Sequence, residues 1–239
     1  MTPISTTQTR EKLYFAEGSS STVITPQRIS EFITQMLQQL PPLRRVLLIP
    51  PDYTRVDSAA GPITTELYRQ LASHAEVAIL PALGTHDPLP SSKRDAMFPG
   101  IPAERFREHR WREDLVRLGS VDANFVSRVS EGAIAYDVPI EINRLLVEGN
   151  WDRIFSIGQL VPHEVIGIAN HVKNVLIGVG GKETIHKSHY LGAVFGMERI
   201  MGRTDSPVRA VLQEGMNRFG EDLPITYLLT VRGFNDVGE

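Results

Sequence analysis

The chain has 239 residues, of which 41% are hydrophobic and 22% are charged, and its formal net charge is −3. This composition is ordinary for a soluble globular protein, and the length allows a sizeable hydrophobic core. A nucleic-acid-binding domain normally carries a basic stripe, and this sequence has none. No apolar run approaches the ~20 residues that a membrane-spanning helix needs.

Cysteine is absent, which excludes disulfides and thiolate metal sites. The N-terminal stretch MTPISTTQTREKLYF lacks the apolar core of a signal peptide. Both observations favour a cytoplasmic protein. Acidic residues interrupt the densest basic segment, Arg105 to Asp114, which we interpret as a solvated helix face rather than a phosphate site.

Helical and strand patterns alternate along the chain. Thr25-Pro26 resembles an N-cap followed by proline at the first helical position, and Pro41-Pro42 ends the helix that this start predicts. Apolar periodicity and short apolar runs predict the elements that follow. They are a strand at Arg44–Pro50, a helix at Ile63–Ala72, a strand at Glu76–Leu83, strands at Ile140–Leu146 and Arg153–Leu160, a helix that begins at Ser206-Pro207, and a strand at Pro224–Arg232.

This order predicts an α/β fold with a mixed, largely parallel sheet, helices on both faces and a Rossmann-like arrangement. Ligand sites in such folds gather at the carboxyl ends of the strands. Two polar loops hold that position, DYTR after the first strand and GTHDPLP after the second. A further polar segment, from Val161 to His189, follows a later strand and contains four of the seven histidines.

Each loop offers a structural and a functional interpretation. Asp52 suits an Asx-type turn, in which its carboxylate accepts backbone N–H groups, or a site for ligand hydroxyls. Arg55 suits a carboxylate or phosphate ligand. His86 is either a surface histidine or a general acid/base, since imidazole titrates near neutral pH.

The spacing of the third segment does not match a local metal motif. His163, Lys173 and His189 are separated by ten and sixteen residues, whereas the zinc motif H-E-x-x-H places its ligands one helical turn apart. His186 and His189 could share one helix face, but no acidic residue at a comparable spacing completes a zinc site. Taken one at a time, these residues fit exposed polar positions.

Taken in order, the motifs resemble those of the lactate racemase family, nickel-pincer nucleotide enzymes that racemise or epimerise 2-hydroxy acids. The order is D-x-T-R after one strand, G-T-H after the next, then P-H, a lysine ten residues later and a histidine sixteen residues beyond it. The resemblance extends from about Arg44 to Phe195. It implies a small-molecule 2-hydroxy acid as substrate and enzymes that make the cofactor as partners. The charge and hydropathy patterns predict no nucleic-acid or membrane partner.

The resemblance also implies a role for each matching residue. Lys173 corresponds to the lysine that holds the nickel-pincer nucleotide through a thioamide, and His189 to the histidine that completes nickel coordination. His86 and His163 correspond to the two histidines that act as acid and base on opposite faces of the substrate. A hydroxy acid's α-hydrogen is too weakly acidic for a side chain to remove as a proton. Its transfer as a hydride to the cofactor avoids a carbanion.

Asp52 and Arg55 correspond to a pair that contacts the cofactor and substrate region, and Arg55 is the better candidate for the substrate carboxylate. The chain departs from the family where S-G-G-R-K usually leads to the lysine, because it reads Ala169-Asn170-His171-Val172-Lys173. Lys182, which follows Gly180-Gly181, is therefore a rival anchor.

A second departure concerns length. The family carries a further C-terminal domain, and this chain ends near Glu239, where that domain should begin. We therefore expect residues 1–239 to be the N-terminal catalytic domain, with the site closed by a missing domain or by a neighbouring subunit of a homo-oligomer.

Three hypotheses remain open. The first is a 2-hydroxy acid racemase or epimerase that depends on the nickel-pincer nucleotide. The second is a zinc-dependent hydrolase that uses His186, His189 and a distant ligand. The third is a non-catalytic module that binds a nucleotide or carboxylate through Arg55 and Lys173.

Overall fold

A computed structural model describes residues 13–233 and divides them into two units, residues 13–42 with Gly233, and residues 43–232. Helix α1 (Pro26–Gln38) dominates the first unit, and it begins as the sequence predicts, because the Thr25 hydroxyl accepts the N–H of Arg28 at 3.2 Å. Within this unit, the Phe15 ring stacks on the Phe32 ring with a centroid distance of 4.2 Å.

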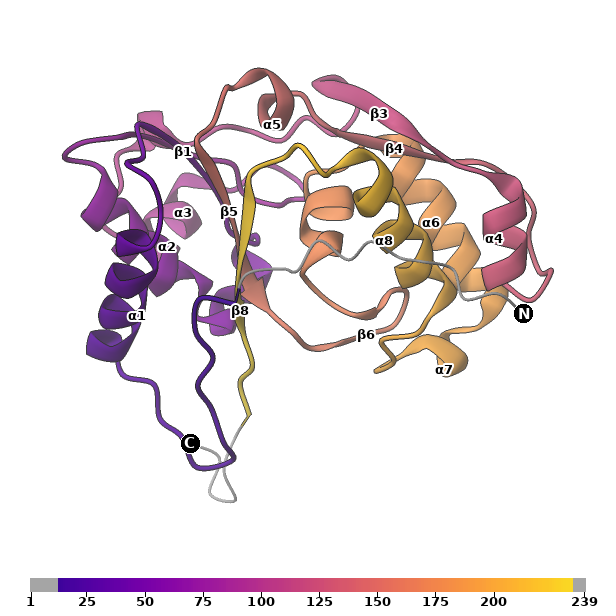
Figure 1. Cartoon of the computed structure of the whole chain (residues 1–239), viewed down its shortest axis with the longest axis horizontal. Helices are drawn as coiled ribbons and strands as arrows, with labels where there is room; N and C mark the ends of the chain where they lie inside the picture. Colours follow the sequence, from indigo (N-terminus) through magenta and orange to yellow (C-terminus); the bar gives the residue numbers. More distant parts are fainter. Residues whose placement is uncertain (1–12, 234–239) are drawn as a thin grey trace. The chain divides into compact units, whose positions relative to one another are not determined.

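The second unit contains the remaining elements (Figure 1). In chain order they are β1 (Arg45–Ile49), the 3-10 segment η1 (Tyr53–Ser58), α2 (Ala60–Leu71), β2 (Glu76–Ile79), α3 (Ser91–Met97), the 3-10 turn η2 (Ala103–Arg105), β3 (Leu115–Val121), α4 (Ala123–Val129), β4 (Val138–Asn143), α5 (Leu145–Glu148), β5 (Arg153–Gln159), β6 (Pro162–His163), β7 (Gly167–Ile168), the π turn η3 (Asn174–Gly178), α6 (Lys182–Phe195), α7 (Met197–Ile200), α8 (Pro207–Phe219) and β8 (Ile225–Thr230). Among the described residues, no helix is both long and apolar enough to cross a bilayer.

The main sheet is parallel and has the strand order β2-β1-β5-β8. Its central strand β1 is apolar on both faces, and Val46 to Ile49 are fully buried, as expected for a parallel strand covered on both sides. On one face, Leu47 and Ile49 belong to the core cluster that includes Val208 of α8. Helix α2 lies against β2 and β5, and Figure 1 shows α2 and α8 on opposite sides of the sheet. The predicted α/β class, with helices on both faces, is confirmed.

A second sheet pairs β3 with β4 in antiparallel orientation, and α6 and α8 pack against it. The strand predicted at Ile140–Leu146 is present as β4 but ends at Asn143. The cause is local, since Asn143 Oδ1 accepts the N–H of Leu145 at 2.9 Å and turns the chain into the short helix α5. The sequence pattern did not predict β3.

The interpretation of Arg105–Asp114 as a helix face is wrong. After the turn η2 this segment contains no helix, and His109 within it is buried. Nε2 of His109 donates to the Gly180 carbonyl oxygen at 3.0 Å, and its Nδ1 accepts the side-chain N–H of Asn143 at 3.1 Å. Two hydrogen bonds of the His109 side chain, one with distant backbone and one with a distant side chain, thus attach this segment to the rest of the unit.

Candidate active site

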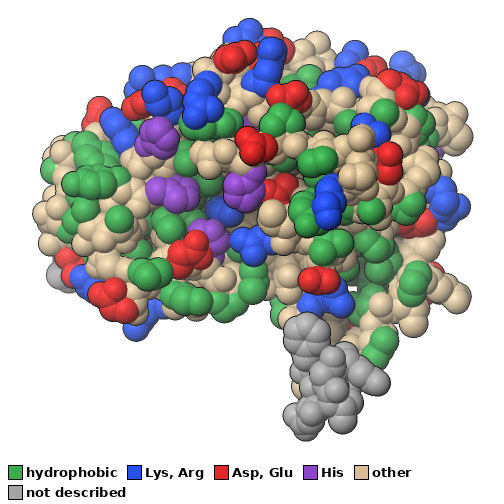
Figure 2. All heavy atoms as spheres, turned by 180° about the vertical axis from the view of Figure 1, so that it is seen from behind, with side chains coloured by type: hydrophobic (Ala, Val, Ile, Leu, Met, Phe, Trp, Pro, Cys, Tyr) green, Lys and Arg blue, Asp and Glu red, His purple; other side chains and the backbone are tan. Residues whose placement is uncertain are grey.

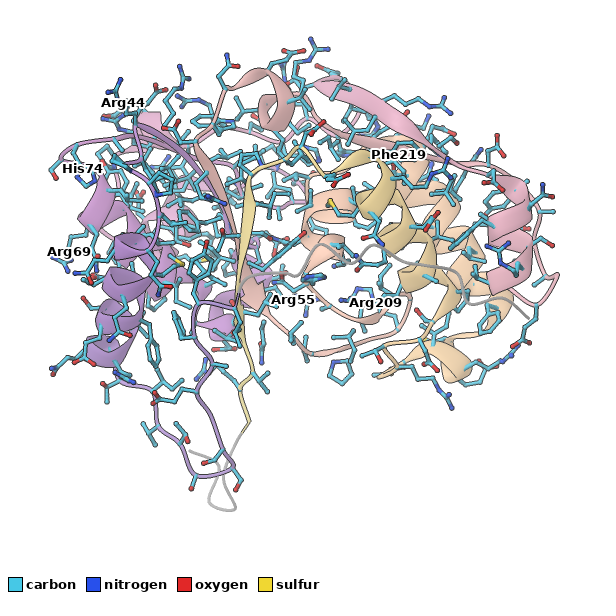
Figure 3. The ribbon with its side chains drawn as sticks, viewed as in Figure 1. Arg44, Arg55, Arg69, His74, Arg209 and Phe219 are labelled. Carbon is cyan, nitrogen blue, oxygen red and sulfur yellow. The ribbon has the colours of Figure 1, made fainter. Side chains whose placement is uncertain are left out.

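The sequence-predicted residues lie at one edge of the main sheet. Asp52 and Arg55 follow β1, His86 follows β2, and His163 lies just after β5. Because these three strands are parallel neighbours, their carboxyl ends meet at the same edge. Figure 3 shows Arg55 and Arg44 at opposite ends of β1, and Figure 2 shows histidine side chains gathered on one face among acidic and basic ones.

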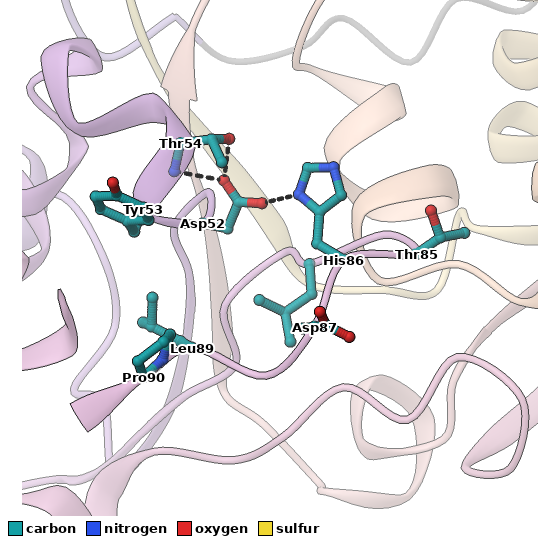
Figure 4. Close-up of a pocket in the computed structure, with 9 residues that line it drawn as sticks. Asp52, Tyr53, Thr54, Thr85, His86, Asp87, Leu89 and Pro90 are labelled. Carbon is teal, nitrogen blue, oxygen red and sulfur yellow. Dashed lines mark hydrogen bonds and ion pairs between the residues drawn. The ribbon is translucent and has the colours of Figure 1, made fainter. Parts of the chain in front are cut away.

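Asp52 and His86 form a hydrogen-bonded pair. Pairing of the chain continues beyond β1 and β2, where the N–H of Ala82 donates to the Pro50 carbonyl oxygen at 2.8 Å, and this brings the two following loops together. Oδ2 of the buried Asp52 then bonds Nδ1 of His86 (Figure 4). Oδ1 accepts the backbone N–H of Thr54 at 2.9 Å, so Asp52 forms the predicted Asx turn and also contacts the histidine.

The loop that carries His86 is held by a glycine. Gly84 has a left-handed φ of 57°, which lets the backbone turn immediately after the strand. Its N–H donates to the Gly178 carbonyl oxygen at 2.8 Å, which ties the loop to the end of η3. A cavity of about 330 Å³ adjoins the pair. Its walls are formed by Asp52, Tyr53, Thr54, Leu83, Thr85, His86, Asp87, Leu89 and Pro90.

His163 is buried, with 7% of its surface exposed. Its Nδ1 accepts the backbone N–H groups of Val165 at 3.1 Å and Ile166 at 3.3 Å. Burial lowers the pKa of His163 to about 4, and the positive charge of Lys173 acts in the same direction. The imidazole is therefore neutral near neutral pH.

Lys173 lies in the same electrostatic environment. Burial lowers its pKa to about 8, and the Arg55 guanidinium adds to this shift, while Glu164 and Asp52 oppose it. The next residue, Asn174, anchors the turn that carries Lys173. Its side-chain amide donates to the Ile49 carbonyl oxygen and to the Ser156 hydroxyl, both at 3.0 Å.

The segment 169–173, which departs from the family pattern, has an unusual backbone conformation. Asn170 and His171 have left-handed φ values of 65° and 58°. Asparagine and histidine are enriched among the non-glycine residues that adopt this conformation. The side-chain oxygen of Asn170 also accepts the N–H of His171 at 2.8 Å. The backbone that leads to Lys173 therefore adopts the left-handed conformation at two residues, and neither of them is glycine.

His189 lies on α6, and its Nε2 nitrogen is the one available to a ligand. Nδ1 donates to the Ile185 carbonyl oxygen at 2.7 Å, which leaves Nε2 with its lone pair. Burial lowers the pKa of His189, and the charge of Lys173 lowers it further. His186 is exposed, and its ring lies 6.0 Å from the Trp111 ring, edge to face. Across residues 13–233, no three His, Cys, Asp or Glu side chains come together as a metal site.

The sequence interpretation missed Glu164. Its Oε2 lies 3.7 Å from Nδ1 of His163, and its side chain is 57% exposed. A hydrogen bond from its own backbone N–H lowers the pKa of Glu164, as do the charges of His163 and Lys173. The adjacency of Glu164 to His163 in P-H-E was the one available signal.

The contacts and electrostatic influences link the six predicted residues into one cluster. Asp52 contacts His86 directly and raises the pKa of Lys173. His189 and Arg55 each act on His163. The rival Lys182 is exposed at the start of α6.

Comparison with known proteins identifies the family. A model described as the lactate racemase N-terminal domain matches residues 31–200. A crystal structure of a protein from Thermotoga maritima is similar, with a TM-score of 0.80 and 28% sequence identity over 89% of this chain and 52% of that chain. The lactate racemase apoprotein from Thermoanaerobacterium thermosaccharolyticum shares the fold, with a TM-score of 0.59 and 17% identity over 88% of this chain and 50% of that chain. No curated protein sequence matches.

The chain therefore spans about half the length of these solved structures, at 52% and 50%. The family match covers well over half of this chain and includes all six residues of the cluster. On that basis, the chain belongs to the lactate racemase N-terminal domain family.

Proposed function

We propose that this chain forms the catalytic core of a racemase or epimerase of 2-hydroxy acids that works with a nickel-pincer nucleotide. The observation that supports the proposal is the chain of interactions at the carboxyl edge of the parallel sheet, where Asp52 bonds His86 and acts on Lys173, and Lys173 acts on His163. When bound, the cofactor would accept the C2 hydrogen of the substrate as a hydride and return it to either face. The protein side chains then have to bind the 2-hydroxy acid and to accept and return its hydroxyl proton.

His86 and His163 are proposed as the acid/base pair. Imidazole is suited to this role because its ordinary pKa, about 6.5, lies near the working pH. His163 is neutral at neutral pH because burial lowers its pKa to about 4. The exposed Arg55 is proposed to bind the substrate carboxylate, since a guanidinium pairs with a carboxylate through two parallel hydrogen bonds.

Lys173 fits the role of covalent anchor. An amine reacts in its neutral form, and a pKa of about 8 leaves roughly one lysine in ten neutral at pH 7. An ordinary lysine, with a pKa of about 10.4, is neutral in only about one case in 2,500. The exposed Lys182 lacks these buried surroundings, which favours Lys173 as the anchor.

The available metal ligands of the protein also fit a nickel ion that is already held by the cofactor. His189 offers Nε2, and imidazole suits nickel. The nickel-pincer nucleotide would bring its own sulfur ligands, so His189 would be the protein's ligand to the metal. The zinc hydrolase alternative lacks a third protein ligand beside His186 and His189 among the described residues.

The test is to express the chain together with the enzymes that make the cofactor and to follow the chirality of several 2-hydroxy acids. We expect racemisation or epimerisation of at least one acid, together with bound nickel. Binding of the cofactor without turnover on any acid would favour the module that only binds a nucleotide or carboxylate. Turnover that requires zinc and no nucleotide would favour the hydrolase.

A further inference from the structure

The two proposed acid/base histidines have opposite surroundings at Nδ1. A neutral imidazole carries its proton on only one of its two nitrogens, and the group that bonds one nitrogen decides the state of the other. His86 faces a carboxylate at Nδ1, whereas His163 faces two backbone N–H groups there.

At His86, Nδ1 has to carry the proton, because the Asp52 carboxylate is an acceptor only. Nε2 therefore holds a lone pair, and Figure 4 shows this nitrogen on the side of the ring away from Asp52. Asp52 is buried, and its other oxygen is held by the N–H of Thr54 at 2.9 Å. The carboxylate is thus fixed in the orientation that makes Nε2 of His86 a proton acceptor.

His163 has the opposite hydrogen-bond pattern at Nδ1. Backbone N–H groups only donate, so the bonds from Val165 and Ile166, at 3.1 and 3.3 Å, require a lone pair on Nδ1 and place the proton on Nε2. The Glu164 carboxylate lies 3.7 Å from the same Nδ1, beyond hydrogen-bond distance, and its side chain is 57% exposed. Nε2 of His163 is thus a donor.

A second proton on His163 would have to sit on Nδ1, facing those two N–H groups. The nearby positive charges of Lys173 and Arg55 oppose it as well, whereas Glu164 favours it. The lowering of the His163 pKa to about 4 agrees with this geometry. The neutral form with Nε2–H is therefore the resting state of His163.

We propose that the two histidines rest in opposite tautomers, so that His86 is set to accept the hydroxyl proton while His163 donates a hydrogen bond from Nε2, with Asp52 as the positioning residue for His86. This inference rests on the proposed function. Nε2 of His86 would accept the O–H proton of the enantiomer whose hydroxyl faces it and become an imidazolium, the O–H electron pair would complete the C=O bond of the keto acid, and the C2 hydrogen would pass with its electron pair to the cofactor. His163 can protonate the product only after it gains a second proton from solvent at Nδ1, because release of its single proton would leave an imidazolate. The other enantiomer needs His163 as acceptor, which means moving the ring proton to Nδ1 and breaking both backbone bonds.

The tautomers can be measured on the chain without cofactor, by long-range 1H–15N correlation spectra of protein labelled at histidine. Spectra at about pH 8 keep imidazoles with the ordinary pKa of about 6.5 neutral. His86→Gln and His163→Gln assign the two signals. We expect protonated Nδ1 in His86 and protonated Nε2 in His163. The same tautomer in both residues, or a protonated Nδ1 in His163, would overturn the proposal.

A matched pair of variants tests the role of Asp52. Asp52→Asn should change the tautomer balance of His86 and leave that of His163 unchanged. Asp87→Asn, which alters a carboxylate in the same loop as His86, should change neither. An unchanged His86 signal in Asp52→Asn would remove Asp52 as its positioning residue.

Kinetics of the cofactor-loaded protein provide an independent readout. A racemisation has an equilibrium constant of one, so kcat/KM is equal for the two enantiomers. A preset direction then appears as unequal kcat with KM unequal in the same ratio, and equal kcat values would contradict it. If the loaded protein racemised no acid, the proposed function would be wrong, whereas the spectra would still decide the tautomers.

Discussion

Removal from water determines the protonation states of the candidate site's side chains. Burial is the largest cause of the lowered pKa at His163, Lys173 and His189, and each of these groups also lies within the influence of another positive charge. Burial therefore favours the neutral imidazole at His163 and His189 and increases the neutral fraction of the Lys173 amine. The exposed His86 is controlled differently, through its bond to Asp52.

Replacement of either acid/base histidine tests the proposed roles. His86→Ala and His163→Ala should each lower the rate of racemisation by ~10²–10⁴-fold, the usual loss when a positioned acid/base is removed. Nickel content should stay nearly unchanged, because neither residue is the proposed metal ligand. Chirality assays and metal analysis of the same preparations measure both. A variant that racemises at the parental rate would remove that histidine from the pair.

Single residues of the site were partly predictable. The positions of Asp52, His86 and His163 after strands were sufficient to expect them at one edge, since parallel strands end together. The tautomers were not predictable from the sequence. Nearly every residue carries a backbone N–H group, so nothing in the sequence indicates that those of Val165 and Ile166 bond His163. The lowered pKa of Lys173 was equally hidden, since it depends on burial and on Arg55, more than a hundred residues away in the sequence.

At the scale of elements, the π turn η3 joins the lysine to the sheet. Asn174 is buried, and its amide satisfies the carbonyl oxygen of Ile49 in β1 and the hydroxyl of Ser156 in β5. The turn therefore depends on one side chain for its attachment to two strands. The sequence pattern did not predict this attachment, because an asparagine can find hydrogen-bond partners in many different structural positions.

Loss of that amide should destabilise the fold. In Asn174→Ala the two acceptors stay buried without their donor, which typically costs about 1–3 kcal/mol for each unsatisfied group. Chemical denaturation should show a lower free energy of unfolding by that order. Asn217→Ala, which removes an exposed asparagine from α8, is the matched control and should change stability by less than about 0.5 kcal/mol. Equal effects of the two substitutions would contradict the attachment.

The segment 105–114 makes stability depend on pH. Burial lowers the pKa of His109 to about 4, and that of His163 falls to about the same value. In the unfolded chain both return to about 6.5, so the unfolded state binds more protons between these values. The stabilisation is complete above about pH 6.5 and is lost as the pH falls toward about 4.

The free energy of unfolding should therefore fall between about pH 7.5 and pH 5, by on the order of 2 kcal/mol for each of the two histidines. Urea denaturation at the two pH values measures this decrease. In His109→Gln, on the order of 2 kcal/mol of this decrease should disappear, because the contribution of His109 is gone. A variant with the parental pH dependence would show that His109 does not contribute.

At the scale of the whole molecule, the α/β class was predictable because each buried strand is a short apolar run followed by a polar loop. Arg45–Ile49 and Arg153–Gln159 are examples. The antiparallel β3–β4 sheet escaped prediction because Leu115–Val121 is mostly half-buried and its register shifts between Arg117 and Gly119. Its strands carry no site residue, so this error did not affect the site.

The fold also brings residues between 52 and 189 into one region, since Asp52, His86 and His163 follow strands of the same sheet edge, and the segments next to η3 and on α6 carry Lys173 and His189. We propose that this arrangement holds one covalently attached cofactor. The most direct test is the intact mass of protein expressed together with the cofactor-making enzymes. Parent protein and Lys182→Ala should carry the mass increment of the cofactor, and Lys173→Ala should lack it. An increment that survives in Lys173→Ala and vanishes in Lys182→Ala would contradict the anchor, and a parent protein with no increment would contradict the covalent cofactor itself.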